Sequence, residues 1–224
     1  GVHVHCQHVS TAISFEAIRA AKAEGLPVTC ETAPHYSALN DEALLKYGTL
    51  AKMNPPLRSE ADRKATIEAI ADGTVDMLAT DHAPHTLDEK KLGFLEAPNG
   101  IIGLECAYGV CHKVLVDGGH ISDKRLIELM ANAPMKLMGH TPTDITALLD
   151  EQQGAVGGTK RVLDLRRVGE AAQIGLAVLN TAEQWTVDPE RFHSKARNTP
   201  FGGWQVSGRP LATIIGTSLA FSRL

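Results

Sequence analysis

The chain has 224 residues, of which 43% are hydrophobic and 21% are charged, and its formal net charge is −4. This composition is typical of a globular protein with one large core or two smaller ones, and it excludes an intrinsically disordered chain. Lysines and arginines are scattered along an acidic sequence, which argues against nucleic acid as a partner. No stretch resembles a secretory signal or is apolar over a length that crosses a bilayer, so we expect a cytoplasmic protein with no membrane partner.

Strands and helices alternate over the first 140 residues. Apolar runs predict strands at 2–9, 28–32 and 75–80, and a short apolar approach to a Pro-Pro turn at 51–54. Helical spacing predicts helices at 12–24, 59–71, 103–116 and 123–138, the last bent or interrupted by Pro134. The first strand is already under way at Val2 in a chain without an initiator methionine, so we expect the chain to be part of a longer protein.

Polar residues predict caps at two of these helix starts. Ser10 or Thr11 precedes the first helix, and Ser59-x-x-Asp62 resembles a capping box in which Asp replaces the preferred Glu. The four cysteines, by contrast, are irregularly spaced in apolar stretches without a CxxC pair, which predicts small buried thiols in a reduced protein.

The sequence changes character after Pro142. Gly154, Gly157 and Gly158 are followed by β-rich pieces at 174–179, 184–187 and 211–215, which suit a small sheet. The strand–helix alternation before this point predicts instead a parallel sheet with right-handed crossovers. We therefore predict an α/β fold with two regions, residues 1–140 and residues 141–224.

The most informative segment is Asp81-His82-Ala83-Pro84-His85, directly after the predicted strand 75–80. Ligands of parallel α/β folds gather beyond the carboxyl ends of the strands. Asp81 at such a place can ligate a divalent metal and accept a proton from water, and the histidines can bind a metal or an anionic substrate. The alternative is a strand end followed by an ordinary polar loop.

Two further segments lie at predicted strand ends, at residues 5–11 and 52–58. His8 in the first is also explained as a core histidine, and Asn54 in the second as a turn residue before Pro-Pro. Each segment by itself is therefore weak evidence for a site.

Together, these segments resemble the dihydroorotases of the amidohydrolase superfamily, most closely the bacterial type with long chains. The matching segments, in that family's order and approximate spacing, are His5-x-x-His8-Val9-Ser10-Thr11, Thr32-Ala33-Pro34-His35, Asn54-Pro55-Pro56-Leu57-Arg58 and Asp81-His82-Ala83-Pro84-His85. Residues 97–105 and 198–201 also resemble the family. The resemblance is to the C-terminal half only. It implies the later strands of a (β/α)8 barrel in residues 1–140, with a linker and part of a small β-sandwich domain in residues 141–224.

The resemblance also implies roles for individual residues. It makes His8 a zinc ligand, and Asp81 both a zinc ligand and the general acid/base. The substrate-binding residues would be Asn54, His85 and the backbone near Asn99 and Gly100. Asn99 departs from the pattern, because many relatives carry an aromatic residue there.

The other histidines of these segments are expected to be structural, namely His3, His5, His35 and His82. His3-Val4-His5 looks like the metal-binding HxH of the superfamily. Its place beside the His8 segment argues against that role.

The implied reaction is the reversible, zinc-dependent cyclisation of N-carbamoyl-L-aspartate to L-dihydroorotate in pyrimidine biosynthesis, carried out by a homodimer. Most ligands of a binuclear zinc site would lie outside this chain, because the superfamily's first-strand HxH, bridging carboxylate and another histidine precede the matched region. We therefore expect the fragment to be inactive alone, to need its missing N-terminal half as a partner, and to have open strand edges at 2–9 and 75–80.

Two other functions stay open. One is another cyclic amidase, of the hydantoinase or allantoinase type, and the other is a non-catalytic scaffold for a carbamoyltransferase partner. His85 favours a dihydroorotase, because the related cyclic amidases usually differ at that place. The presence of Asp81 and Asn54 favours an enzyme over a scaffold.

Overall fold

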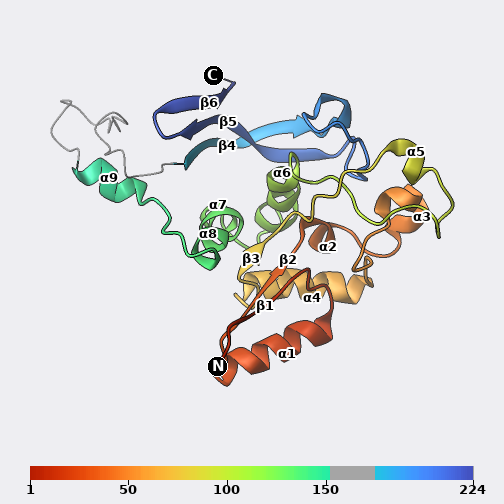
Figure 1. Cartoon of the computed structure of the whole chain (residues 1–224), viewed down its shortest axis with the longest axis horizontal. Coiled ribbons are helices and arrows are strands. Elements are labelled where there is room, and N and C mark those ends of the chain that lie inside the picture. The colour runs from red at the N-terminus through yellow and green to blue at the C-terminus, as the bar shows by residue number, and fades with distance from the viewer. Residues whose placement is uncertain (152–174, 224) are drawn as a thin grey trace.

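The computed structural model describes residues 1–151 and 175–223, which form an α/β fold with two sheets. The first sheet is parallel and has the order β1 (Val4–Cys6), β2 (Val28–Thr32), β3 (Met77–Leu78). The second is antiparallel and has the order β4 (Gly175–Thr186), β5 (Gln205–Ile215), β6 (Ser218–Ser222). Figure 1 shows the parallel sheet in the lower half of the molecule and the antiparallel sheet above it, with α6 (Ala107–Cys111) between them. The α/β class predicted from the sequence is confirmed.

In the parallel sheet, β1 and β3 lie within the predicted strands 2–9 and 75–80 and pair with β2 on either side. Val4 pairs with Val28, and Glu31 pairs with Met77. Both outer strands are shorter than predicted. The ladder nevertheless continues on either side of β3, because the N–H of Asp76 donates to the carbonyl of Cys30 and the N–H of Ala79 donates to that of Thr32.

Helices α1 (Ala12–Ala23) and α4 (Glu60–Ala71) pack on one face of this sheet. Phe15 of α1 and Ile70 of α4 are fully buried in one core cluster, which also includes Cys30 of the middle strand. Burial of an apolar side chain of this size stabilises the fold by about 1.5–3 kcal/mol. This apolar layer, more than the short ladder, holds the three strands together.

The cap of α1 differs from the prediction. Thr11 occupies the N-cap position, but its side chain makes no capping hydrogen bond. The carboxylate of Asp62, in the first turn of α4, instead accepts from the N–H of Ala12 at 2.9 Å. The predicted cap of α4 is confirmed, since the hydroxyl of Ser59 accepts from the N–H of Asp62.

The strand end predicted at residues 51–54 is wrong. This segment follows α2 (Pro34–Ala38), α3 (Ala43–Tyr47) and the 3-10 helix η1 (Gly48–Ala51), and the structure has no strand there. A short apolar run before Pro-Pro does not distinguish a strand from a tight turn, and the N–H of Lys52 donates to the carbonyl of Thr49 within such a turn. In place of the predicted strand end at this segment, the sheet has the end of β2, at Thr32.

The predicted helices at 103–116 and 123–138 each contain a wider π turn. Helix α6 continues as the π-helix η2 (His112–Val116), and α7 (Asp123–Ile127) continues through the π-helix η3 (Glu128–Asn132) into α8 (Ala133–Leu137). The π turn of η3 ends just before Pro134. Proline has no N–H to donate to an i−4 carbonyl, so the interruption predicted at Pro134 is present as a π turn and not as a break in the helix. The short helices α5 (Leu87–Lys90) and α9 (Ile145–Glu151) were not predicted.

The antiparallel sheet contains all three predicted β-rich pieces. The pieces at 174–179 and 184–187 form the single strand β4, whose pairing with β5 is irregular between Asn180 and Gln184. A 3-10 helix, η5 (Pro189–Arg191), follows β4. Gly109 of α6 lets β5 approach closely, because a Cβ at this position would lie 2.8 Å from Val206. The glycines at 154, 157 and 158 lie outside the described residues.

The outer edges of β1 and β3 have no strand partner within residues 1–151 and 175–223. Val4 on β1 is 51% exposed. This agrees with the prediction of open edges at these strands. The four cysteines are free, and Cys30, Cys106 and Cys111 are buried as predicted. No helix of the described part is long and apolar enough to cross a membrane.

Candidate active site

His8 and Asp81 lie together at the carboxyl edge of the parallel sheet. His8 follows β1, Asp81 follows β3, and β2 runs between them. Both residues have positive backbone dihedrals, with φ of 54° at His8 and 48° at Asp81. This conformation is uncommon for residues other than glycine, and it concentrates at functional sites. The two strands thus end in the same kind of sharp turn, which directs both side chains to one place.

Each ring nitrogen of His8 faces a different carboxylate. Nε2 lies 3.7 Å from Oδ1 of Asp81, and Nδ1 lies 3.4 Å from Oε1 of Glu31. The side chains of His8 and Asp81 are 27% and 26% exposed, whereas that of Glu31 is 8% exposed. The site therefore has an accessible pair of side chains, His8 and Asp81, above a buried carboxylate.

The surroundings of Asp81 favour its protonated form. Burial raises the pKa of its carboxyl above the ordinary value, and although His8 lowers it, the negative charge of Glu31 adds to the rise. Burial also raises the pKa of the Tyr36 hydroxyl, and the carboxylate of Asp81 adds to that rise. A carboxyl group whose pKa lies closer to neutrality is better suited to exchange protons with a substrate.

The predicted substrate-binding residues His85, Asn99 and Gly100 are in contact. Nε2 of His85 lies 2.9 Å from the carbonyl oxygen of Asn99. Gly100 has a φ of 114°, and a Cβ there would lie 2.5 Å from the Cβ of Ala83. Only glycine fits this crossing of the two loops, and their contact fixes the backbone around Asn99.

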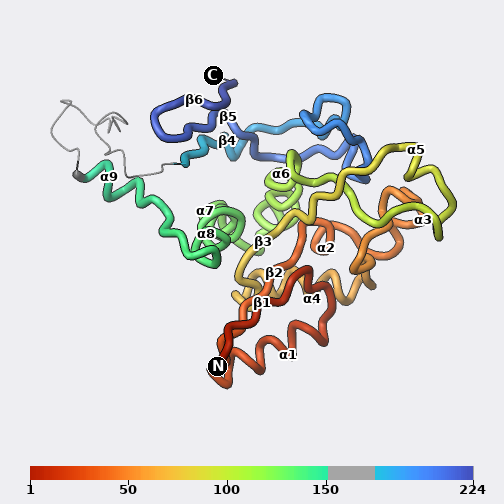
Figure 2. Tube along the Cα trace, in the orientation of Figure 1, coloured from red at the N-terminus to blue at the C-terminus, as the bar shows by residue number. Residues whose placement is uncertain are grey.

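Asn198 joins the same two loops from the far end of the chain. Its side chain is fully buried, accepts from the N–H of His85 at 3.1 Å, and donates to the carbonyls of Ala83 at 3.0 Å and Gly100 at 3.2 Å. Its backbone carbonyl accepts from the N–H of Ile102. Figure 2 shows the segment before α6 running beside the C-terminal chain. The Asn198 amide thus holds both loops at once.

Two lysines hold the same region from another side. Lys90 is 3% exposed and donates to the carbonyls of Pro98 at 2.9 Å and Gly100 at 3.0 Å. Lys52 donates to the carbonyl of Ala97 at 2.6 Å, and its own carbonyl accepts from the N–H of Gly100. The carbonyls on either side of Asn99 therefore face an ammonium group.

Asn54 lies on an exposed loop next to this edge. The carbonyl of the following residue, Pro55, accepts from the hydroxyl of Tyr36 at 2.7 Å. This hydrogen bond ties the loop to α2, whose first residues follow β2. Asn54 is thus near the strand ends, although no contact joins it to His8, Asp81 or His85 in the described part of the chain.

The four histidines expected to be structural are either in contact with protein groups or buried. His3 and His5 both lie within hydrogen-bond distance of the Thr29 hydroxyl. Nδ1 of His82 faces the N–H groups of Gly103 and Leu104 at 3.3 Å each. His35 is buried, and burial, with a smaller contribution from His8, lowers its pKa to about 3, so it is neutral at physiological pH.

The described residues contain no group of three or more His, Cys, Asp or Glu side chains that could hold a metal ion. His8 and Asp81 nevertheless suit two positions of a shared site, because Nε2 and Oδ1 are nearby and partly exposed. Nδ1 of His8 is buried and makes no hydrogen bond, which leaves Nε2 as the accessible donor atom for a metal. The two residues fit part of a metal site, and further ligands would have to come from elsewhere.

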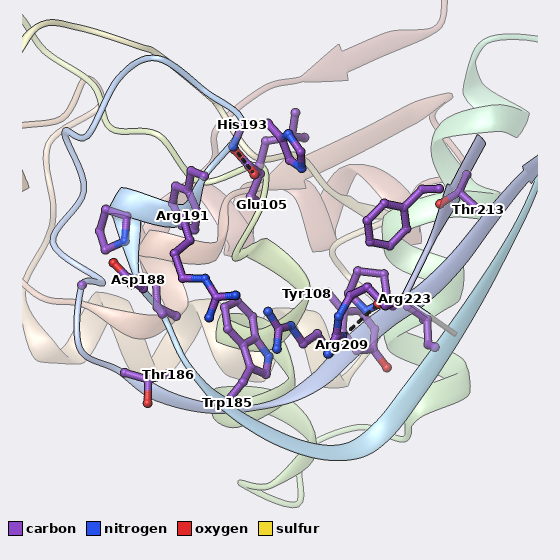
Figure 3. A pocket seen from close by; sticks show the side chains of 18 of the residues that line it. Glu105, Tyr108, Trp185, Thr186, Asp188, Arg191, His193, Arg209, Thr213 and Arg223 are labelled. Atoms are coloured by element: carbon purple, nitrogen blue, oxygen red, sulfur yellow. Dashed lines mark hydrogen bonds between the residues drawn. The ribbon is translucent and has the colours of Figure 1, made fainter. Parts of the chain in front are cut away.

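A separate hollow of about 1150 Å³ lies beside the antiparallel sheet (Figure 3). Trp185 borders it, with the Arg209 guanidinium 5.2 Å from its ring centroid. Glu105, which also borders it, accepts from the N–H groups of His193 and Ser194. The carboxylate of Glu105 is thus already hydrogen-bonded, and His8, Asp81 and His85 do not line the hollow. The strand-end site is therefore the better candidate for acid/base chemistry.

Comparison with known proteins indicates the relatives of the chain. No protein-family model matches the chain. A dihydroorotase from Anaeromyxobacter dehalogenans is 44% identical over 218 residues, which are 96% of this chain and 45% of that protein. A dihydroorotase from Trichlorobacter lovleyi is 43% identical over 223 residues, which are 99% of this chain and 47% of that protein.

The chain is related to the dihydroorotases. It spans about half the length of the dihydroorotases that it matches, which fits their C-terminal half. Among solved structures, an L-hydantoinase (dihydropyrimidinase) from Arthrobacter aurescens superposes with a TM-score of 0.81 at 28% identity, covering 100% of this chain and 46% of that one. A D-hydantoinase (dihydropyrimidinase) from Thermus sp. gives a TM-score of 0.79 at 23% identity, covering 99% and 45%, and shows the shared fold alone.

Sequence reasoning missed three polar residues of this strand-end site. Glu31 carried a signal, because it is a charged residue inside a predicted buried strand. Asn198 lies in a segment that resembles the family, but the residues that its side chain contacts lie 98 to 115 positions earlier in the sequence. Lys90 lies in a run of charged residues and carried no signal.

We expect Asn198→Ala to lower the free energy of unfolding of the full-length protein by about 2–3 kcal/mol, because the N–H of His85 and the carbonyl of Ala83 lose their partner, whereas the carbonyl of Gly100 keeps Lys90. Urea unfolding measures this change. Asn180→Ala is the control, because Asn180 of β4 is exposed and its side chain accepts from the N–H of Ala182 in the same strand. Equal losses in the two variants would contradict the role of Asn198 as the link between the loops.

We also expect Lys90 to give the protein a measurable pH dependence. Burial, together with the nearby Lys52, lowers the pKa of Lys90 from 10.5 to about 8. Between pH 8 and pH 10.5, Lys90 is protonated in the unfolded chain more often than in the folded protein. The free energy of unfolding, compared with that of a Lys90→Met variant, therefore rises with pH from about 8 to about 10.5. Unfolding at several pH values tests this, with the exposed Lys91→Met as a control that lacks the slope. A flat or falling difference for Lys90→Met would be inconsistent with a desolvated ammonium.

Proposed function

We propose that the full-length protein is a dihydroorotase, which interconverts N-carbamoyl-L-aspartate and L-dihydroorotate. The observation that carries the proposal is the match, at 41–44% identity, to proteins named dihydroorotase over nearly the whole chain. The solved neighbour at 28% identity is named hydantoinase, which keeps another cyclic amide as the alternative substrate. Because Nε2 of His85 contacts the carbonyl of Asn99, Nδ1 is the ring nitrogen that would face a substrate carboxylate, as a donor when the ring is protonated.

Within this proposal, His8 and Asp81 contribute two ligands of a zinc site, with Nε2 and Oδ1 as the donor atoms. A zinc ion bound there would polarise the amide carbonyl of the substrate and lower the pKa of water. The other ligands lie in the part of the protein outside this chain. The number of zinc ions and a homodimeric state stay predictions from the resemblance.

Asp81 performs the proton transfer in this proposal. In the hydrolytic direction its carboxylate accepts a proton from the attacking water and then donates it to the ring nitrogen as the C–N bond breaks. In the cyclising direction the carboxylate takes the proton from the carbamoyl nitrogen as the C–N bond forms, and gives it to the hydroxyl group of the substrate carboxyl carbon, which leaves as water. The raised pKa of Asp81 supports this double role, because one group must both accept and release the proton.

The substrate is held by the neighbouring loops. We assign its carboxylates to His85, to Asn54 and to the backbone near Asn99, which Gly100 shapes while its own N–H donates to the carbonyl of Lys52. The Asn198 amide and the Lys90 ammonium fix this backbone before substrate arrives, so little ordering is needed on binding.

We propose that the rest of the protein completes the fold along the open edges of β1 and β3, as further strands of a (β/α)8 barrel. The relatives are about twice as long as this chain, and Val4 on the β1 edge is half exposed. The antiparallel sheet would then belong to a small β domain. The chain alone is expected to lack turnover, because it holds too few ligands for a catalytic zinc site.

Turnover of three substrates tests the proposal. The full-length protein is expected to convert dihydroorotate faster than hydantoin or allantoin. Turnover of hydantoin without turnover of dihydroorotate would assign it to the alternative class of cyclic amidases. An intact protein that binds no metal and acts on none of the three would support the scaffold function.

Asp81→Asn is expected to reduce kcat of the full-length protein by at least about 10²–10⁴-fold, because the proton acceptor is lost. His85→Ala is expected mainly to raise KM, since His85 lies on the loop beside Asn99 and not beside His8. Steady-state kinetics on dihydroorotate separate the two effects. Near-normal kcat in Asp81→Asn would rule out the acid/base assignment.

A further inference from the structure

Glu31 is a buried carboxylate in the middle strand of the parallel sheet. Side chains alternate along β2, and Cys30 packs into the core with α1 and α4, so Glu31 and Thr29 face the opposite side. That face is polar, because His5 lies 2.8 Å from the Thr29 hydroxyl and 3.3 Å from Oε2 of Glu31. Inward faces of parallel sheets are ordinarily filled by branched apolar side chains. A carboxylate here therefore needs partners that offset the cost of its burial.

The second oxygen of Glu31 faces His8. Oε1 lies 3.4 Å from Nδ1 of His8, and that nitrogen is buried without a hydrogen bond. The other nitrogen of the ring, Nε2, lies 3.7 Å from Oδ1 of Asp81. The imidazole thus lies between two carboxylates, with its buried nitrogen toward Glu31 and its accessible nitrogen toward the reaction site.

We propose that Glu31 is a positioning residue for His8. Its carboxylate accepts the Nδ1–H of His8, which fixes the ring orientation and leaves the lone pair of Nε2 free for a metal ion. The proposal rests on the proposed function only in taking His8 as a zinc ligand. Histidines that bind metals generally donate their second N–H to a carboxylate or a carbonyl, which sets the tautomer and raises the basicity of the ligating nitrogen.

The competing explanation is that Glu31 serves only to hold His5. Glu31→Gln distinguishes the two roles when compared with His5→Gln. Glutamine has one acceptor oxygen where glutamate has two, so it cannot accept from both imidazoles. His5→Gln changes the other partner of Glu31 and leaves the contact with His8 in place.

Zinc affinity of the full-length protein is the first test, measured by competition with a chromophoric chelator after the bound metal has been removed. Glu31→Gln is expected to weaken zinc binding by about 10–100-fold, whereas His5→Gln leaves it nearly unchanged. Wild-type affinity in Glu31→Gln, equal losses in both variants, or no zinc binding by the unsubstituted protein would overturn the proposal.

The second test needs no change at Glu31. Long-range ¹H–¹⁵N spectra of the metal-free protein at alkaline pH report the neutral tautomer of His8, which His8→Gln assigns by loss of its signals. We expect the Nδ1–H tautomer, and an Nε2–H tautomer would overturn the proposal. Neither test uses turnover, so a protein that binds zinc as described but hydrolyses another cyclic amide contradicts the proposed function and leaves the role of Glu31 intact.

Discussion

Parallel pairing of β1, β2 and β3 is the constraint on which the candidate site depends. Strands that run in one direction end at one edge, so the residues after β1 and β3 meet although many residues separate them in the sequence. His8 and Asp81 come within 3.7 Å in this way, and the buried middle strand places Glu31 beneath them. The ladder itself is short. The apolar layer of α1 and α4, with Phe15 and Ile70 fully buried, keeps the strand ends in position.

The two sides of the site are stabilised differently. The loops around Asn99 are held by saturated polar contacts, in which the amide of Asn198 and the ammonium of Lys90 satisfy buried carbonyls. A fully satisfied buried network of this kind rigidifies the backbone that it contacts. On the other side, Nδ1 of His8 is buried and lacks a hydrogen bond. The loops around Asn99 are therefore fixed by the fold, whereas His8 has one contact that a small movement of the ring would complete.

The sequence predicted the α/β class and the residues at two strand ends, because apolar runs followed by Asp or His are local patterns. Asp81 and His8 could be found in this way. The same reasoning failed at residues 51–54, where a short apolar run before Pro-Pro becomes a 3-10 turn. Glu31 and Asn198 could not be assigned roles, since each depends on partners that only the fold brings near. Helical spacing predicted the helices at 103–116 and 123–138 but not the π turns within them, because one wider turn leaves little trace in the pattern of apolar residues.

The position of Asn198 near the end of the chain sets an order of assembly during synthesis. Chains emerge from the ribosome N-terminus first, so the parallel sheet, α1 and α4 can pack while the C-terminal sheet is still being made. The loops at Ala83 and Gly100 lack their shared amide partner until residue 198 has emerged and folded back. His8 and Asp81 can thus be brought together early, whereas the loops at Ala83 and Gly100 are joined late. Premature termination before Asn198 would leave His8 and Asp81 in place, and the loops at Ala83 and Gly100 without the amide that joins them.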